Sequence, residues 1–157
     1  MKKLVWDTSA IINIKEPNEQ GYSPGHSLFN DLSDGWIAGP YLNFFPTLAV
    51  FEVSAAVSRK LREGQSILRE FYLLDENSAL YDLDTAVIRK SHELFALPGF
   101  DQLRGADLVF ACIARLESAT LVTLDGAFAK HVGHSIDVLD LKHSLTEPRY
   151  REHFATY

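Results

Sequence analysis

The 157-residue chain has one cysteine, Cys112, so it can form no internal disulfide bond. It also has no run of about 18 apolar residues such as a membrane span requires, and we expect no association with membranes. The apolar stretch that follows Lys2 and Lys3 stops at Asp7, which is too early for a secretory signal peptide. These features together predict a soluble protein of the reducing cytoplasm.

Basic residues are few as well, with 15 Lys and Arg against 21 Asp and Glu and a formal net charge of −6. Such a chain is a poor candidate for coating nucleic acid, because that function relies on a basic surface. The objection weakens if several acids share one site with divalent cations, which would offset part of the negative charge. The sequence has no glycine-rich phosphate loop, and its six histidines show no zinc-binding spacing.

The length and a composition of 46% apolar and 23% charged residues fit a single globular domain. Short apolar runs alternate with helical segments, which predicts a three-layer α/β/α sandwich around a mainly parallel central sheet. We expect residues 1–142 to form the domain and residues 143–157 to be a C-terminal extension of it. The expected strands are 4–6, 41–45, 79–83, 120–124 and 136–139, the expected helices 8–14, 27–33, 47–63, 65–75, 84–97, 106–117 and 126–132, and the expected loops 15–27 and 98–104.

Two aspartates, Asp7 and Asp125, directly follow the last apolar residue of an expected strand. In a parallel sheet the carboxyl ends of the strands meet at one edge, where ligands bind, so both side chains should lie there. Each aspartate alone is equally well explained as a turn-forming or helix-capping residue. Asp107 lies in the first turn of the helix expected at 106–117, where the helix dipole favours an acid by about 0.3–1 kcal/mol without any function.

The helical face below Asp107 carries the small residues Ala111, Ala114 and Ser118. Such a strip leaves room for ions, or it allows another element to pack closely. Glu52 lies off the apolar stripe that begins with Val50 and Val53, so periodicity favours a solvated side chain. Arg59 shares the helical face of Glu52 and would suit a phosphate contact near any site that includes this glutamate.

Four short segments each carry one of these acids, and together they resemble the four acidic motifs of PIN-domain nucleases in order, spacing and type of element. Within that family the chain resembles the VapC-like ribonuclease toxins of prokaryotic type II toxin–antitoxin pairs, over about residues 3–140. The segments are VWDTSAII at 5–12, TLAVFEV at 47–53, RGAD at 104–107 and LVTLD at 121–125.

The resemblance implies a metal-dependent endoribonuclease with one or two Mg²⁺ or Mn²⁺ ions. It also implies RNA as the substrate, a homodimer, and an antitoxin protein that would lie across the acidic groove. The sequence departs from relatives after Asp125, where GAF offers no further acid, in the longer loop at 15–27, and in the tail beyond 140. The implied catalytic and metal-binding residues are Asp7, Glu52, Asp107 and Asp125, with Ser9 and Thr123 as supporting residues and Arg59 as an RNA contact.

The chemistry suits these residue types, because Mg²⁺ and Mn²⁺ prefer hard oxygen ligands. Our hypothesis is that three aspartates bind metal directly or through water, while Glu52 completes the ligand set or orients the nucleophilic water. Several carboxylates in one place repel one another, so we expect raised pKa values in the cluster. An antitoxin could also contact the apolar residues of the helices expected at 47–63 and 65–75, including Phe71, Tyr72 and Leu73.

Other protein families also have an aspartate directly after the first strand. A haloacid-dehalogenase-type phosphatase would need a second aspartate two residues later, where this chain has Ser9, and a receiver domain would need paired acids and a late lysine. Two further alternatives use the same fold. One is a catalytically silent module that binds RNA or protein, and the other is a nuclease that processes RNA without an antitoxin.

Overall fold

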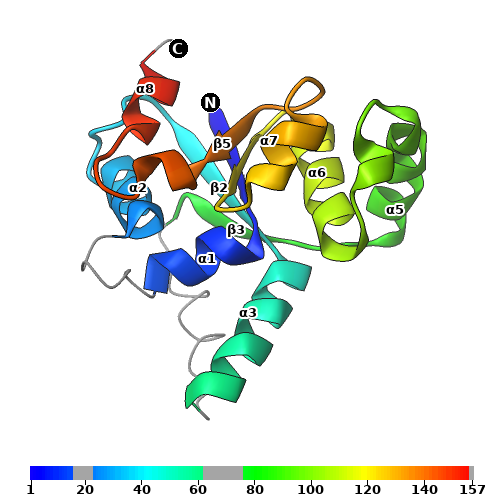
Figure 1. The fold of residues 1–157 in the computed structure, drawn as a ribbon, viewed down its shortest axis with the longest axis horizontal. Helices are drawn as coiled ribbons and strands as arrows, with labels where there is room; N and C mark the ends of the chain where they lie inside the picture. Colours follow the sequence, from blue (N-terminus) through cyan, green and yellow to red (C-terminus); the bar gives the residue numbers. More distant parts are fainter. Residues whose placement is uncertain (16–22, 62–75, 156–157) are drawn as a thin grey trace.

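Five parallel strands form the central sheet in a computed structural model of the protein, in the order β3-β2-β1-β4-β5 (Figure 1). The structure describes residues 1–15, 23–61 and 76–155, with the side chains of residues 57–61 outside the description. The strands are β1 (Lys2–Trp6), β2 (Tyr41–Pro46), β3 (Ser78–Tyr81), β4 (Thr120–Thr123) and β5 (Val138–Asp140).

The central strand β1 pairs with β2 on one side and with β4 on the other, with Leu4 opposite Asn43 and Thr120. Because all four pairings are parallel, every strand ends at the same edge of the sheet. The residues that directly follow the strands therefore lie at this edge. The expected parallel sheet is therefore confirmed.

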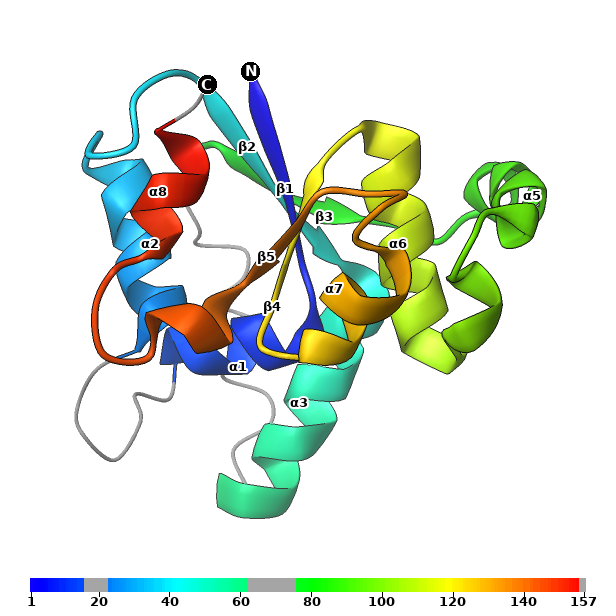
Figure 2. The same ribbon diagram turned by 45° about the horizontal axis from the view of Figure 1, so that its top comes forward.

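Helices cover both faces of the sheet, which confirms the expected three-layer sandwich. Figure 2 shows α1, α2 and α8 on one side of the sheet and α6 and α7 on the other, while α3 projects away from the body. The α-helices are α1 (Thr8–Lys15), α2 (Pro24–Ser33), α3 (Thr47–Leu61), α5 (Thr85–His92), α6 (Gly105–Glu117), α7 (Gly126–Val132) and α8 (Tyr150–Phe154), and the 3₁₀ helices are η1 (Glu93–Ala96), η2 (Phe100–Gln102) and η3 (Leu141–Ser144).

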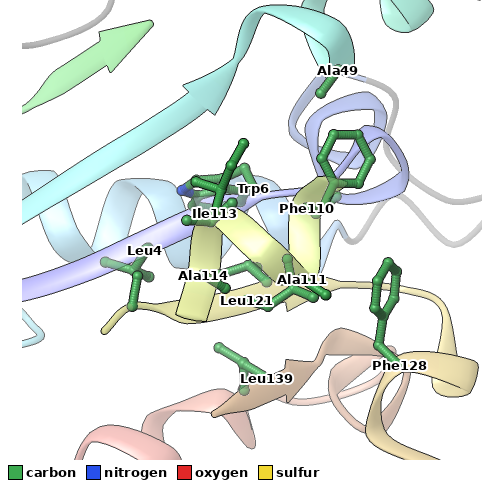
Figure 3. Close-up of a cluster of buried hydrophobic side chains, with 14 of the residues drawn as sticks. Leu4, Trp6, Ala49, Phe110, Ala111, Ile113, Ala114, Leu121, Phe128 and Leu139 are labelled. Atoms are coloured by element: carbon green, nitrogen blue, oxygen red, sulfur yellow. The ribbon is translucent and has the colours of Figure 1, made fainter. Parts of the chain in front are cut away.

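The core is built from the apolar strand residues and the helix faces that pack on them (Figure 3). Trp6 is fully buried and stacks on Phe45 at 5.9 Å between ring centroids, and its indole N–H donates to Asn43 Oδ1 at 2.9 Å. Ala111 and Ala114 of α6 are also buried, so this part of the small-residue strip packs the helix closely. Burial of these side chains fixes β1 and α6, and therefore the acids at their ends.

The loop expected at 15–27 is wrong for residues 24–27, which form the first turn of α2. The reason is the N-terminal cap: Ser23 Oγ accepts the N–H of His26 at 3.2 Å, and Pro24 occupies the first helical turn, where a proline is tolerated. Gly25 packs so closely on α1 that a Cβ atom there would lie 3.0 Å from the Ala10 carbonyl oxygen. A proline and a glycine therefore begin this helix instead of breaking it.

The helix expected at 84–97 is α-helical only to His92 and continues as the 3₁₀ helix η1. The loop expected at 98–104 contains η2, because Phe100 turns inward and is buried. Gly99 has φ +85°, and a Cβ atom there would lie 1.6 Å from the carbonyl oxygen of His131, so only glycine allows this approach to α7. Residues 62–63 of the expected helix 47–63, and all of the helix expected at 65–75, lie outside the described residues.

The C-terminal residues pack on α2 and β5. Arg151 of α8 pairs with Asp31 of α2 at 2.7 Å, and Tyr150 Oη donates to the same carboxylate at 2.7 Å. The domain boundary at residue 142 stays a prediction, and η3 runs across it. No helix in the described part of the chain is both long and apolar enough to span a bilayer.

Candidate active site

Asp7 directly follows β1 and is the most buried of the predicted site acids, with 3% of its surface exposed. Three hydrogen bonds hold its carboxylate. Ser9 Oγ donates to Oδ1 at 2.7 Å, the backbone N–H of Ala10 donates to the same oxygen at 2.8 Å, and Thr123 Oγ1 donates to Oδ2 at 2.6 Å. Both oxygens of Asp7 are therefore fixed in direction.

The same two hydroxyl groups connect Asp7 to the end of β4. Thr123 Oγ1 accepts the backbone N–H of Asp125 at 2.8 Å, and Ser9 Oγ accepts that of Leu124 at 2.9 Å. Asp125 in turn caps α7, because its Oδ1 accepts the N–H of Ala127 at 2.9 Å. Asp7 and Asp125 thus lie at the same sheet edge, as the strand ends predicted, and Asp125 also has the capping role that was the alternative.

Burial raises the pKa of Asp7 to about 6. Hydrogen bonds from Thr123, Ala10 and Ser9 lower this pKa, but they do not offset the loss of water around the carboxylate, and the negative charge of Asp107 raises it further. The folded protein therefore holds a costly negative charge at this point.

Asp107 lies in the first turn of α6, as predicted, and its side chain is exposed. Partial desolvation raises the pKa of this carboxyl group, and the charges of Asp125 and Glu52 raise it further. Asp107 therefore interacts electrostatically with all three of the other predicted acids, since it also acts on Asp7. The expected raised pKa values are confirmed for Asp7 and Asp107, although desolvation is a larger cause than repulsion at both.

Glu52 does not have the solvated position that periodicity favoured. It is half-buried, and the hydroxyl of Thr8 donates to its Oε2. The reason is that α3 begins at the carboxyl end of β2 and packs against α1 there, so this face of its first two turns meets α1 (Figure 2). Glu52 is thereby tied to the residue next to Asp7.

The structure brings these acids to one rim of the sheet but does not gather them tightly. Among the described residues, no three His, Cys, Asp or Glu side chains stand close enough together to hold a metal ion. The side chain of Arg59 lies outside the described residues, so its predicted contact with RNA stays a prediction. The catalytic roles of the four acids and the supporting roles of Ser9 and Thr123 also stay predictions at this point.

Two residues near the rim were missed by the sequence analysis. Thr8 holds Glu52, and Asp140 ends β5 opposite Thr123, where a Cβ atom on Gly126 would lie 3.4 Å from its Oδ2. A signal for Asp140 existed, since it follows the apolar residues of the last strand just as Asp7 and Asp125 follow theirs. Nothing local predicts the partner of Thr8, which comes from a distant helix.

Known structures show the same architecture at low sequence identity, and this likeness concerns the fold. The toxin–antitoxin complex VapBC2 from Rickettsia felis, bound to a promoter DNA fragment, matches with a TM-score of 0.62 and 20% identity, over 88% of this chain and 98% of that chain. DNA-bound VapBC from Salmonella typhimurium gives 0.62 and 19%, over 89% and 98%. VapC20 from Mycobacterium tuberculosis, a toxin that cleaves the sarcin–ricin loop, gives 0.55 and 13%, over 81% and 93%.

No protein of curated function matches the chain at the sequence level. The family model described as the PIN domain matches residues 4–133, which include all four predicted acids, strands β2 to β4 and the last three residues of β1. The match thus spans most of the sequence and agrees with the fold. The chain belongs to the PIN-domain family.

Proposed function

We propose that this chain is a magnesium- or manganese-dependent endoribonuclease that hydrolyses RNA phosphodiester bonds at the acidic rim. The observation that carries the proposal is that Ser9 and Thr123 join the buried Asp7 carboxylate to the backbone at Asp125, while Thr8, next to Asp7, holds Glu52. The charge of Asp107 raises the pKa of Asp7, and a cation at the rim would offset this repulsion. Membership of the PIN-domain family supports the same assignment.

The donor chemistry of the rim fits a hard divalent cation, because its side chains offer carboxylate oxygens and no thiol. A magnesium ion keeps several of its waters and needs only one or two carboxylates, which suits a described site without three clustered ligands. Asp7, Asp107 and Asp125 would hold one or two such ions, directly or through water. When bound, the ions supply Lewis-acid stabilisation of the charge that develops on the phosphate oxygens.

The protein's own residues supply orientation. Ser9 and Thr123 keep both oxygens of Asp7 in place. The carboxylate of Asp7 is therefore already oriented before the substrate binds, and no conformational freedom is lost at that step. Thr8 holds one oxygen of Glu52, which leaves the carboxylate positioned to complete the ligand set or to orient the attacking water. Asp107 is exposed, and it is the acid best able to adjust to the phosphate group.

The test is the substitution Asp107→Asn, which removes one charge from an exposed side chain and should leave the fold intact. We expect magnesium-dependent cleavage of RNA to fall at least about a hundredfold, because metal assistance contributes several kcal/mol to such reactions. The matched control is Asp34→Asn at the end of α2, also an exposed acid. A purified Asp107→Asn variant that cuts RNA at the parent rate would refute the assignment.

We further propose that the enzyme is the toxin of a type II toxin–antitoxin pair, that it forms a homodimer, and that it acts in the cytoplasm. Solved VapBC complexes with this fold support an antitoxin partner. An antitoxin arginine is the group best suited to the acidic rim, because a guanidinium pairs with carboxylates through two parallel hydrogen bonds. A small upstream reading frame with a DNA-binding N-terminus would support this role, and without one an RNA-processing nuclease without an antitoxin is favoured.

A second candidate is a catalytically silent PIN module that binds RNA or protein. One observation favours it, namely that no three metal-ligating side chains converge among the described residues. A titration with Mn²⁺ followed by calorimetry separates the two candidates. Saturable binding that Asp107→Asn weakens supports the nuclease, whereas the silent module would bind no Mn²⁺ and cut no RNA.

A further inference from the structure

A cavity of about 700 Å³ opens at the opposite end of the sheet from the acidic rim. It lies at the first residues of β1, β4 and β5, beside the C-terminal end of α6, and Phe154 of α8 also lines it. The five residues of β1 separate this cavity from Asp7 by about 16 Å, at about 3.3 Å per residue. Its volume is typical of small-molecule sites, which measure roughly 300–1,000 Å³.

The mouth of the cavity is positively charged. Lys2 lines it and donates to the uncharged carbonyl of Ala38, so the charge of Lys2 is not neutralised there. Arg115 also lines it, is exposed, and has no ion-pair partner among the described residues. By contrast, Lys3 is already paired with Glu117 at 2.9 Å. Two cations are therefore available to a ligand.

Asp137 is the one acid among the described residues that line the cavity, and two side chains already contact its carboxylate. His153 contacts its Oδ2 at 2.9 Å, and Thr120 donates to the same oxygen at 2.5 Å. These hydrogen bonds, led by that of His153, hold the pKa of Asp137 below its usual range, although burial acts in the opposite direction. The carboxylate therefore stays negatively charged, and the two unpaired cations, Lys2 and Arg115, outnumber it at the mouth.

The floor of the cavity is apolar. Ala114 from α6, Ala119 before β4, Ile136 before β5 and Phe154 from α8 line it, and each has at most 8% of its surface exposed. A ligand that placed an apolar or aromatic body on this floor would displace water from the small part of these side chains that is still exposed. The cavity thus combines a charged mouth with an apolar interior.

We propose that this cavity binds a small anion with an apolar or aromatic body, its anionic head at Lys2 and Arg115 and its body against the floor of Ala114, Ala119, Ile136 and Phe154. Two sources of that chemistry are a nucleoside monophosphate and an aromatic carboxylate. The site is separate from the acidic rim and does not depend on the proposed nuclease activity.

The test uses amide NMR spectra of the full chain in EDTA, so that no divalent ion can bring a phosphate to the rim. The probes are AMP, benzoate, inorganic phosphate and adenosine. We expect AMP or benzoate to shift the amide signals of Ala119, Thr120 and Ser135 saturably, and inorganic phosphate and adenosine to bind at least about fivefold more weakly. The tighter of the two organic anions identifies the source.

The variant Arg115→Gln should weaken binding of that anion about tenfold, because it removes one charge-assisted hydrogen bond. Its matched control is Lys142→Gln, another exposed cation, which does not line the cavity. Both variants should cut RNA at the parent rate, which separates this proposal from the proposed function. The proposal is overturned if neither anion binds at millimolar concentration, if inorganic phosphate binds as tightly as the tighter organic anion, or if Arg115→Gln binds like the parent.

Discussion

Two aspartates of the chain, Asp7 and Asp31, have similarly small exposed fractions, 3% and 7% of their surfaces. Their pKa values nevertheless shift in opposite directions. Burial raises the pKa of Asp7 to about 6, against hydrogen bonds from neutral donors. Burial acts on Asp31 in the same sense, but hydrogen bonds from Arg151 and Tyr150 bring its pKa below the usual value. The guanidinium group of Arg151 and the shallower position of the Asp31 carboxyl group, which fewer protein atoms surround, both contribute to the difference.

This comparison shows what hydroxyl and amide donors can do for a buried carboxylate and what they cannot. They fix the direction of both oxygens of Asp7, but their dipoles do not supply the countercharge that Arg151 gives to Asp31. The negative charge of Asp31 is balanced by a residue of the same chain, Arg151. No described residue gives Asp7 such a countercharge, and the divalent ion or partner arginine proposed above would supply one.

The largest expected effect is on cleavage. Asp7→Asn keeps the shape of the side chain but removes its charge, so we expect magnesium-dependent RNA cleavage to fall at least about a hundredfold. Asp31→Asn should cleave at the parent rate at a temperature where it is folded, because Asp31 lies on α2 away from the rim. Equal losses in both variants would mean that the comparison reflects general stability and not the rim.

The second effect is the contribution of Asp31 to the stability of the folded protein. Asp31→Asn removes a charge that Arg151 and Tyr150 depend on, and we expect the free energy of unfolding at pH 7 to fall by about 2 kcal/mol. Because the folded pKa of Asp31 is lowered, its contribution is present above pH 4 and is lost as the pH falls further. Urea denaturation at pH 7 and at pH 3 should therefore show the gap between variant and parent closing in acid.

The matched control for that measurement is Asp34→Asn, at the exposed C-cap of the same helix. It should unfold within about 0.5 kcal/mol of the parent at both pH values. A loss at Asp34 as large as that at Asp31 would show that helix capping, and not the pairing with Arg151, accounts for the effect.

The third effect has the opposite sign. In EDTA at pH 7.5, Asp7→Asn should raise the free energy of unfolding by about 1 kcal/mol, because the parent must keep a buried charge whose pKa is raised to about 6. The gain is smaller than the roughly 3 kcal/mol that two pKa units represent, since an amide nitrogen cannot accept the bonds that carboxylate oxygens accept.

The sign of this pH dependence follows from the raised pKa. As the pH falls from 7 towards 4, Asp7 takes up a proton in the folded state first, the parent gains stability, and the advantage of Asp7→Asn disappears. Thermal unfolding between pH 4 and pH 8 measures this directly. An advantage that grew in acid would contradict the cause assigned to the raised pKa.

The smallest effect sharpens the account of Asp31. Tyr150→Phe removes one hydrogen bond to that carboxylate and leaves Arg151 in place, so we expect a loss of about 0.5–1 kcal/mol. Combining Tyr150→Phe with Asp31→Asn in a double-mutant cycle should give less than the sum of the single losses, because both changes act on one network. Additive losses would show that the two residues stabilise the fold independently.

The succession of strands along the chain and the positions of Asp7 and Asp125 could be predicted from sequence, because parallel strands bring their carboxyl ends to one edge and apolar runs mark those ends. The orientation of Glu52 could not be predicted, since helical periodicity describes one helix and the partner, Thr8, belongs to another. Asp140 was missed although it directly follows the strand expected at 136–139, as Asp7 and Asp125 follow theirs. Its position opposite Thr123 depends on strand pairing.

The start of α2 was missed for a different reason. Proline and glycine interrupt helices in the middle but are accepted at their beginning, and only the Ser23 cap and the contact of Gly25 with α1 distinguish the two cases. The cavity at the amino ends of the strands has no sequence signal at all. Its cations and its floor come from segments that are distant along the chain, from Lys2 to Phe154.

The pairing of α8 with α2 has a practical consequence for anyone who shortens this protein. Cutting the chain after residue 142 would discard Tyr150 and Arg151, so Asp31 would lose both hydrogen-bond partners and the positive charge that balances it. No magnesium supplement could restore this contact between α8 and α2. Expression vectors should therefore keep the last turn of helix and place any affinity tag beyond it.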